Sequence, residues 1–212
     1  QPDWDTARIV SRIRVEGEDN MRGPLREGRG VVAALPHMAN WDHAGAWACV
    51  TGAPVTTVAE RLKPEALFER FLAFREGLGM EIIPLTGGQG DVFMTLAARL
   101  REPRLVPLLA DRDLSRRGIG VTLLGESTRM PAGPAVLAVR TGSALLPVSL
   151  WYEGAEPDHQ LVVRFHEELE PPTGVRGAER IARLTQDLAA EFSRSIAAHA
   201  HDWHMLQPLF LA

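Results

Sequence analysis

Cysteine is almost absent from this sequence, because Cys49 is the only one among 212 residues. A single thiol excludes an intrachain disulfide, so nothing in the sequence indicates an oxidising compartment. Long apolar runs are absent too, since no stretch approaches the ~18–20 residues that a membrane-spanning helix needs. The chain starts at Gln1 and runs almost at once into helix-like sequence, so we expect that part of the native protein precedes it.

Lysine is equally scarce: Lys63 is the only one, and all the remaining residues counted as Lys or Arg are arginines. The formal net charge is −4, which argues against a protein that binds nucleic acid. Arginine presents a planar fork of donors that suits phosphate and carboxylate groups. The arginines crowded between residues 99 and 129 are therefore candidate anion contacts, and solvated surface charge is the alternative explanation for most of them.

Short apolar segments alternate with amphipathic ones, a pattern that predicts an α/β fold. Strands are expected over residues 28–36, 53–60, 80–85, 104–111, 118–125, 144–154 and 159–169. Helices are expected over 41–52, 63–79, 91–102, 131–142 and 177–200, and an exposed helix with a loop over 4–27. Since no linker or repeat interrupts the alternation, residues 1–212 are predicted to form one layered domain, with helices flanking a central, mostly parallel β-sheet.

Polar residues stand at the carboxyl ends of three of the expected strands. His37 follows the first, Glu60 ends the second, and Asp111 ends the strand at 104–111. In open α/β sheets, binding sites gather at the carboxyl ends of the strands. We therefore expect His37, Glu60 and Asp111 to meet at one edge of the sheet.

The stretch "HMANWD" places His37 five residues before Asp42, at the start of a helix. Asn40 is a good N-cap, and an acidic residue in the first turn is favoured by the helix dipole. An ordinary helix start thus explains Asn40 and Asp42, but it does not explain the histidine. The alternative is a catalytic pair, in which a carboxylate holds one ring nitrogen and the other acts as a general base.

Four blocks in order carry a resemblance: "LPHMANWDHAGAW", "LLADRDLS", "MPAGPAVLAVRTGSALLPVSL" and "DWHMLQPL". With its H-x-x-x-x-D motif, the sequence resembles the glycerolipid and lipid A acyltransferase superfamily. Within that superfamily it is most similar to bacterial phosphatidylinositol mannoside acyltransferases. The resemblance covers about Gly28 to His204. It implies a glycerolipid acyltransferase-like α/β fold, an acyl-CoA donor and peripheral attachment to the cytoplasmic face of the cell membrane.

The resemblance also implies roles for particular residues. His37, Asp42 and Asp111 fall on catalytic positions, and Arg75 falls where the family places an arginine for a phosphate of donor or acceptor. The common Glu-Gly-Thr-Arg block is missing, and "ADRDLS" stands there with "GEST" further on. The candidate substrate-binding residues are Asn40, Glu60, Arg75, Arg112, Arg116, Glu126 and Arg129.

The implied reaction moves a fatty acyl chain from acyl-CoA to a hydroxyl of an anionic glycolipid, such as a mannose of phosphatidylinositol mannoside. His37 would take the hydroxyl proton, and Asp42 or Asp111 would hold the ring. Backbone amides near Asn40, or at the end of the strand before Asp111, are candidates for the oxyanion site. Acyl-CoA is a co-substrate, so neither a cofactor nor a metal is expected. Two rivals are a lipid esterase or thioesterase with the same pair, and a non-catalytic lipid-binding module.

Overall fold

Val31–Leu35 (β2) lies inside the sheet, between two other strands, because five consecutive apolar residues leave it no polar face. It is parallel to both neighbours, Ala144–Glu153 (β8) and Leu105–Leu109 (β5). Parallel strands covered on both faces are expected to be apolar throughout, as β2 is. The computed structural model describes residues 5–61, 63–85, 91–113, 115, 117–155 and 158–211.

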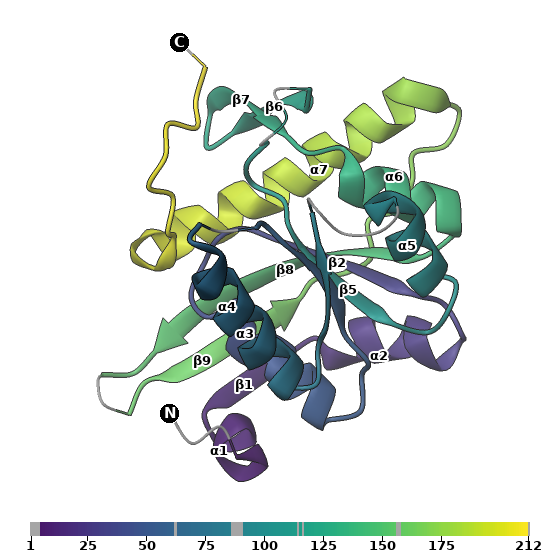
Figure 1. The fold of residues 1–212 in the computed structure, drawn as a ribbon. Helices are drawn as coiled ribbons and strands as arrows, with labels where there is room; N and C mark the ends of the chain where they lie inside the picture. Colours follow the sequence, from purple (N-terminus) through teal and green to yellow (C-terminus); the bar gives the residue numbers. More distant parts are fainter. Residues whose placement is uncertain are drawn as a thin grey trace.

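Five strands form the main sheet, in the order β1-β9-β8-β2-β5 (Figure 1). Ile13–Glu16 (β1) is parallel to Gln160–Phe165 (β9), and β9 is antiparallel to β8. The prediction of an α/β domain with a mostly parallel central sheet is confirmed by this pairing.

Two further strands continue the sheet past β5. Val55 forms a parallel bridge with Leu105, and Thr56–Ala59 (β3) pairs in parallel with Glu81–Pro84 (β4). The Thr57 hydroxyl donates to the Pro107 carbonyl at 2.7 Å. The carboxyl ends of β2, β5 and β3 are thereby brought to one edge of the molecule.

Helices cover both faces of the sheet (Figure 1). On one face α5, α6 and α7 lie together, and on the other α2 packs on β9, β8 and β2, with α1 against α3. Helix α4 packs on β4. The helix bounds are Thr6–Ser11 (α1), Glu18–Arg26 (α2), Trp41–Val50 (α3), Glu65–Gly77 (α4), Val92–Arg99 (α5), Gly133–Thr141 (α6), Gly177–Ala198 (α7) and the 3-10 turn Ala200–Asp202 (η1).

Two strands differ from the expectation. Residues 4–27 were expected to hold a helix and a loop, but β1 lies between α1 and α2, because Ile13 and Val15 supply apolar side chains for pairing with β9. Ile119–Leu123 (β6) folds back on Glu126–Met130 (β7), whose polar sequence gave no strand signal. Leu124 and Gly125 both have positive φ, at 54° and 87°, as a tight hairpin turn requires.

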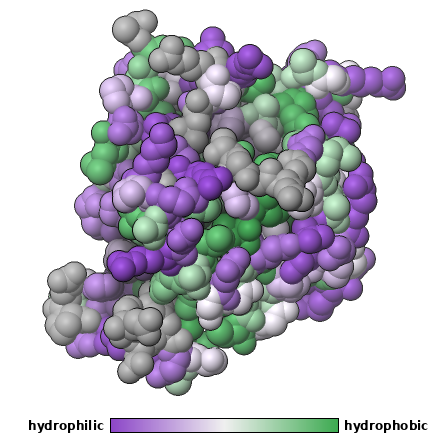
Figure 2. All heavy atoms as spheres, viewed as in Figure 1, coloured by the Kyte–Doolittle hydropathy of each residue, from purple (hydrophilic) through white to green (hydrophobic). Residues whose placement is uncertain are grey.

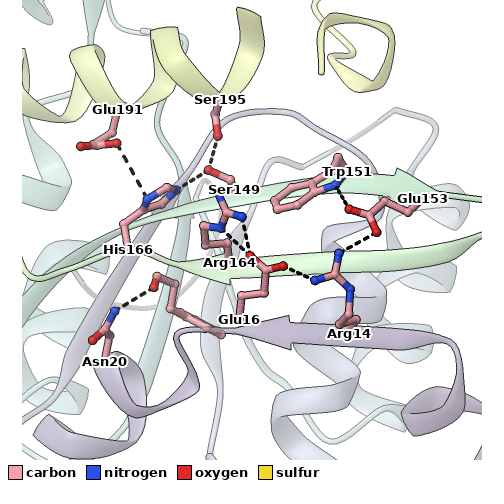
Figure 3. A network of polar contacts seen from close by, with 11 residues as sticks. Arg14, Glu16, Asn20, Ser149, Trp151, Glu153, Arg164, His166, Glu191 and Ser195 are labelled. Atoms are coloured by element: carbon pink, nitrogen blue, oxygen red, sulfur yellow. Dashed lines mark hydrogen bonds and ion pairs between the residues drawn. The ribbon is translucent and has the colours of Figure 1, made fainter. Parts of the chain in front are cut away.

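A polar network ties α7 to the sheet (Figure 3). The His166 ring lies between Ser149 of β8, at 2.6 Å from its Nε2, and Glu191 of α7, at 3.8 Å from its Nδ1. Ser195 of α7 donates to the Ser149 hydroxyl. Burial is the main cause that lowers the pKa of His166, so the folded state favours the neutral ring.

We expect the protein to lose stability as the pH falls below about 6.5, the ordinary pKa of histidine. Because the folded-state pKa of His166 is lowered, the unfolded chain binds more protons in this range, and stability rises with pH. Burial lowers the pKa of His43 in the same direction. Urea unfolding at pH 7.5 and 5.5 measures the loss, and His166→Gln should make it smaller. An unchanged loss in that variant would exclude His166 as a contributor.

Candidate active site

A cavity of about 270 Å³ opens at the carboxyl ends of β2, β3 and β5. Its charged residues follow these strands or come from the helices beside them, and most of its other lining residues are apolar. The lining residues are Leu35, His37, Trp41, Asp42, Gly45, Thr57, Val58, Ala59, Glu60, Arg75, Met80, Leu85, Pro107, Leu109 and Arg112. Figure 2 shows hydrophobic residues gathered in the middle of the viewed face, with hydrophilic residues around them.

His37 and Asp111 form a pair at the edge of this cavity. The Nδ1 atom of His37 lies 2.5 Å from Asp111 Oδ1, and the His37 backbone N–H donates to Oδ2 at 2.9 Å. Asp111 is fully buried, whereas 28% of the His37 side chain is exposed. A buried carboxylate that holds one ring nitrogen leaves the other, Nε2, as the nitrogen that can exchange a proton with a substrate.

Asp42, the second acidic residue of the H-x-x-x-x-D motif, contacts Arg75 of α4. The guanidinium donates from Nε to Oδ1 at 2.7 Å and from Nη2 to Oδ2 at 3.3 Å. Both side chains are mostly buried, at 21% and 18% exposed. Arg75 continues the apolar stripe of α4, and this two-point ion pair satisfies a charge that would otherwise be costly there.

At the wall of the cavity, Gly45 allows Met80 to pack closely against α3. Gly45 lies inside α3, where glycine costs ~1 kcal/mol relative to alanine. A Cβ placed at Gly45 would lie 2.9 Å from both Sδ and Cε of Met80. Trp41 presents its ring edge-on to His37, with centroids 5.8 Å apart. His37 therefore lines the same cavity as the apolar side chains of Trp41 and Met80.

The structure brings together most of the predicted site residues. His37, Asp42, Glu60, Arg75 and Arg112 line the cavity, and Asp111 contacts His37. The expectation that His37, Glu60 and Asp111 meet at one sheet edge is confirmed by this arrangement.

Other candidates lie elsewhere. Asn40 caps α3, where its Oδ1 accepts from the His43 backbone at 3.0 Å. Glu126 and Arg129 lie on β7, and Arg129 donates to the Gly118 carbonyl at 2.9 Å; neither is among the described residues that line the cavity. Arg116 lies outside the described residues.

Two features resemble other kinds of site. Ser149, His166 and Glu191 have the composition of a catalytic triad, but Ser149 is only 3% exposed, so a substrate carbonyl has no path to its hydroxyl (Figure 3). His43 directly follows Asp42 and could suggest a metal ligand, but its Nε2 lies 2.9 Å from the Ile9 carbonyl. Across the described part of the chain, no three His, Cys, Asp or Glu side chains are grouped as a metal site requires.

One site residue was missed by the sequence reasoning. The Trp203 indole N–H donates to Asp111 Oδ2 at 2.9 Å. The tryptophan lies in "DWHMLQPL", a block that carried the family resemblance, but nothing in the spacing linked a residue 92 positions away to Asp111.

The class of protein is thus an α/β layered fold with a His–carboxylate pair at the edge of a largely apolar cavity. The chain belongs to the bacterial lipid A biosynthesis acyltransferase family, whose sequence profile matches residues 2–212. It is 46% identical to the phosphatidylinositol mannoside acyltransferase of Mycolicibacterium smegmatis, over all of this chain and 66% of that protein. It is 48% identical to the protein of the same name from Mycobacterium tuberculosis, over 97% of this chain and 62% of that protein. The chain thus spans slightly less than two thirds of the length of these relatives.

Proposed function

We propose that this chain carries the catalytic site of an acyl-CoA-dependent O-acyltransferase that acts on phosphatidylinositol mannoside. The observation that carries the proposal is the His37–Asp111 pair at the edge of an apolar cavity. The family and the names of the relatives from two mycobacterial species support the reaction and the acceptor. The donor is an acyl-CoA, and the acceptor is an anionic glycolipid.

The proton transfer follows from the geometry of the pair. A mannose hydroxyl is a weak nucleophile at neutral pH, and His37 Nε2 takes its proton as the oxygen attacks the thioester carbonyl. The buried carboxylate of Asp111 stabilises the imidazolium that forms. The C–S bond then breaks, and the proton passes from His37 to the sulfur of CoA. A thiol is a good leaving group, so no covalent acyl-enzyme is needed.

The backbone amides around His37 narrow the choice of oxyanion site. The amide of Met38 donates to the Pro36 carbonyl, that of Ala39 to the Asp202 carbonyl, and that of Ala110 to the Leu35 carbonyl. These amides are therefore engaged. In the first turn of α3, Asn40 accepts from the amide of His43, which leaves the amides of Trp41 and Asp42 among the positions that have no intrahelical partner. We assign the oxyanion to them.

Arg75 and Arg112 are the cations of the cavity, and we assign them to substrate phosphate. The Asp42 carboxylate fixes the Arg75 fork, and Glu60 at the same opening is placed to accept from acceptor hydroxyls.

Arg75→Lys is expected to lower kcat/KM about tenfold, and Arg75→Ala about 10²-fold, since a hydrogen bond to a charged group contributes about 1.5–3 kcal/mol. Lysine keeps the charge but loses the two-point contact. Arg29→Lys is the matched control, because Arg29 makes a two-point pair with Glu168 at 3.1 and 2.6 Å away from the cavity. Steady-state kinetics with both substrates measure kcat/KM for each variant. If both Arg75 variants keep the wild-type kcat/KM, Arg75 has a structural role and does not bind phosphate.

A peripheral membrane location at the cytoplasmic face is part of the proposal. No helix in the part of the chain that the structure describes is long and apolar enough to cross a bilayer. Helix α4, beside the cavity, exposes Leu67 and Phe71 at 41% and 40%. Such a helix can lie in the interfacial plane, with basic side chains near anionic headgroups.

Vesicle sedimentation tests the contact through α4. The chain is expected to bind vesicles that contain anionic lipid, and binding should weaken as salt screens the charges. Leu67→Ser with Phe71→Ser should reduce the bound fraction, whereas Val10→Ser, which removes a 44% exposed apolar side chain from α1, should not. Equal loss in both variants, or no binding at any salt concentration, would refute this surface.

The overall proposal is tested by following a labelled acyl chain from acyl-CoA, with and without phosphatidylinositol mannoside. We expect label in the glycolipid and little free fatty acid. Free fatty acid that forms at the same rate without acceptor would indicate a thioesterase, and binding without turnover would indicate a lipid-binding module. Either result refutes the transferase.

A further inference from the structure

The segment His199–His204, called here the C-terminal loop, runs beside the catalytic histidine. The His204 amide donates to the His37 carbonyl at 2.7 Å, and the Ala39 amide donates to the Asp202 carbonyl at 2.9 Å. Between them, Met38 and Trp203 form an antiparallel bridge. The backbone of the C-terminal loop is thus paired with His37 and with the two residues that follow it.

The C-terminal loop is fixed from its other side by the sheet. Asp202 is 6% exposed, and its Oδ2 accepts from the Tyr152 backbone N–H of β8 at 3.0 Å. Ala39 has a φ of 45°, in the left-handed region that a residue with a Cβ seldom adopts. Its amide reaches Asp202 in that conformation, so the backbone at the site depends on the loop.

Trp203 contributes a side-chain donor to the pair. Asp111 Oδ2 accepts from the Trp203 indole and from the His37 backbone, both at 2.9 Å, while Oδ1 lies 2.5 Å from His37 Nδ1. Two donors from different parts of the chain hold Oδ2, and this keeps Oδ1 turned toward the imidazole. These donors replace the hydrogen bonds to water that a buried carboxylate loses.

We infer that Trp203 is a positioning residue of the reaction, which acts by holding the Asp111 carboxylate in line with His37. The inference rests on the proposed function, because it takes His37 as the general base. Trp203 is not among the described residues that line the cavity, so its removal is expected to change the rate of proton transfer and to leave substrate binding intact.

Trp203→Phe is the decisive variant, because it keeps an aromatic ring and removes only the donor. We expect kcat to fall about tenfold, which corresponds to the loss of one hydrogen bond to a charged group. The KM for each substrate should stay within about twofold of its original value. The acidic limb of the pH profile of kcat/KM should move to higher pH, since a carboxylate with one donor fewer attracts the imidazolium proton more strongly.

Trp151→Phe is the matched control. The Trp151 indole also donates to a carboxylate, that of Glu153, at 3.0 Å, and a phenylalanine keeps the ring that stacks on His199. A kcat and pH profile for Trp203→Phe equal to those of the control would overturn the inference. His37→Ala is measured beside it: an active His37→Ala refutes the proposed function, whereas an inactive His37→Ala with a normal Trp203→Phe refutes only the inference.

NMR of the unmodified chain gives a second test in case Trp203→Phe does not fold. The indole proton of Trp203 is followed while His37 is titrated in the same spectra. We expect its chemical shift to move with the protonation of His37, because the Trp203 indole and the His37 ring are both hydrogen-bonded to the Asp111 carboxylate. An indole proton that does not respond overturns the inference.

Discussion

His37→Ala is expected to reduce acyl transfer about 10²–10⁴-fold, the usual effect of removing a general base. No other described histidine lines the cavity, so no second imidazole can take over the proton. Initial rates of labelled acyl transfer, with both substrates above their KM, measure the effect. Binding of acyl-CoA should persist, since the chain keeps the apolar wall and the cavity arginines.

The control for His37→Ala is a variant that restores the contact to the buried carboxylate. Removal of the imidazole leaves Asp111 with two donors instead of three, and a buried acceptor that loses a partner costs ~1–3 kcal/mol of stability. His37→Asn carries a side-chain N–H that can reach Asp111 but cannot act as a base. It should fold like the native chain and be as inactive as the alanine variant. Near-normal transfer by either folded variant would refute the mechanism.

Much of the fold could be predicted because its central elements are locally consistent. The five apolar residues of β2 predict a strand buried on both faces, and Asp91 predicts a helix start, which its bonds to Phe93 and Met94 confirm. The strand β1 could not be predicted, because its stability comes from pairing with a strand about 150 residues away. Tertiary pairing, rather than local preference, makes it a strand.

The site could be predicted as a group of residues but not as a set of pairs. Polar residues after parallel strands meet at one edge, so His37, Glu60 and Asp111 were found from their positions alone. Spacing could not decide between Asp42 and Asp111 as the partner of His37. That choice depends on where α4 places Arg75, and on a tryptophan from the C-terminal loop, neither of which has a local signal.

Asp111→Asn and Asp42→Asn are expected to differ in kind as well as in size. Asp111 is fully buried and accepts from His37 Nδ1, so its replacement removes the charge that stabilises the imidazolium and turns an amide N–H toward a ring donor. We expect kcat to fall about 10²–10⁴-fold with little change in KM. Asp42 contacts Arg75 instead, so Asp42→Asn should raise KM about tenfold, because the guanidinium fork loses its charged partner.

Both asparagine variants keep the shape of the side chain, so thermal unfolding should show them folded. Steady-state kinetics with acyl-CoA and lipid acceptor varied in turn separate the two effects. Because the carboxylate of Asp111 acts only through the ring, Asp111→Asn combined with His37→Ala should be no slower than His37→Ala alone, whereas Asp42→Asn should still raise KM in that background. Equal, mild effects of the two single variants would mean that neither carboxylate orients His37, and a KM effect from Asp111→Asn with normal kcat would exchange the roles assigned here.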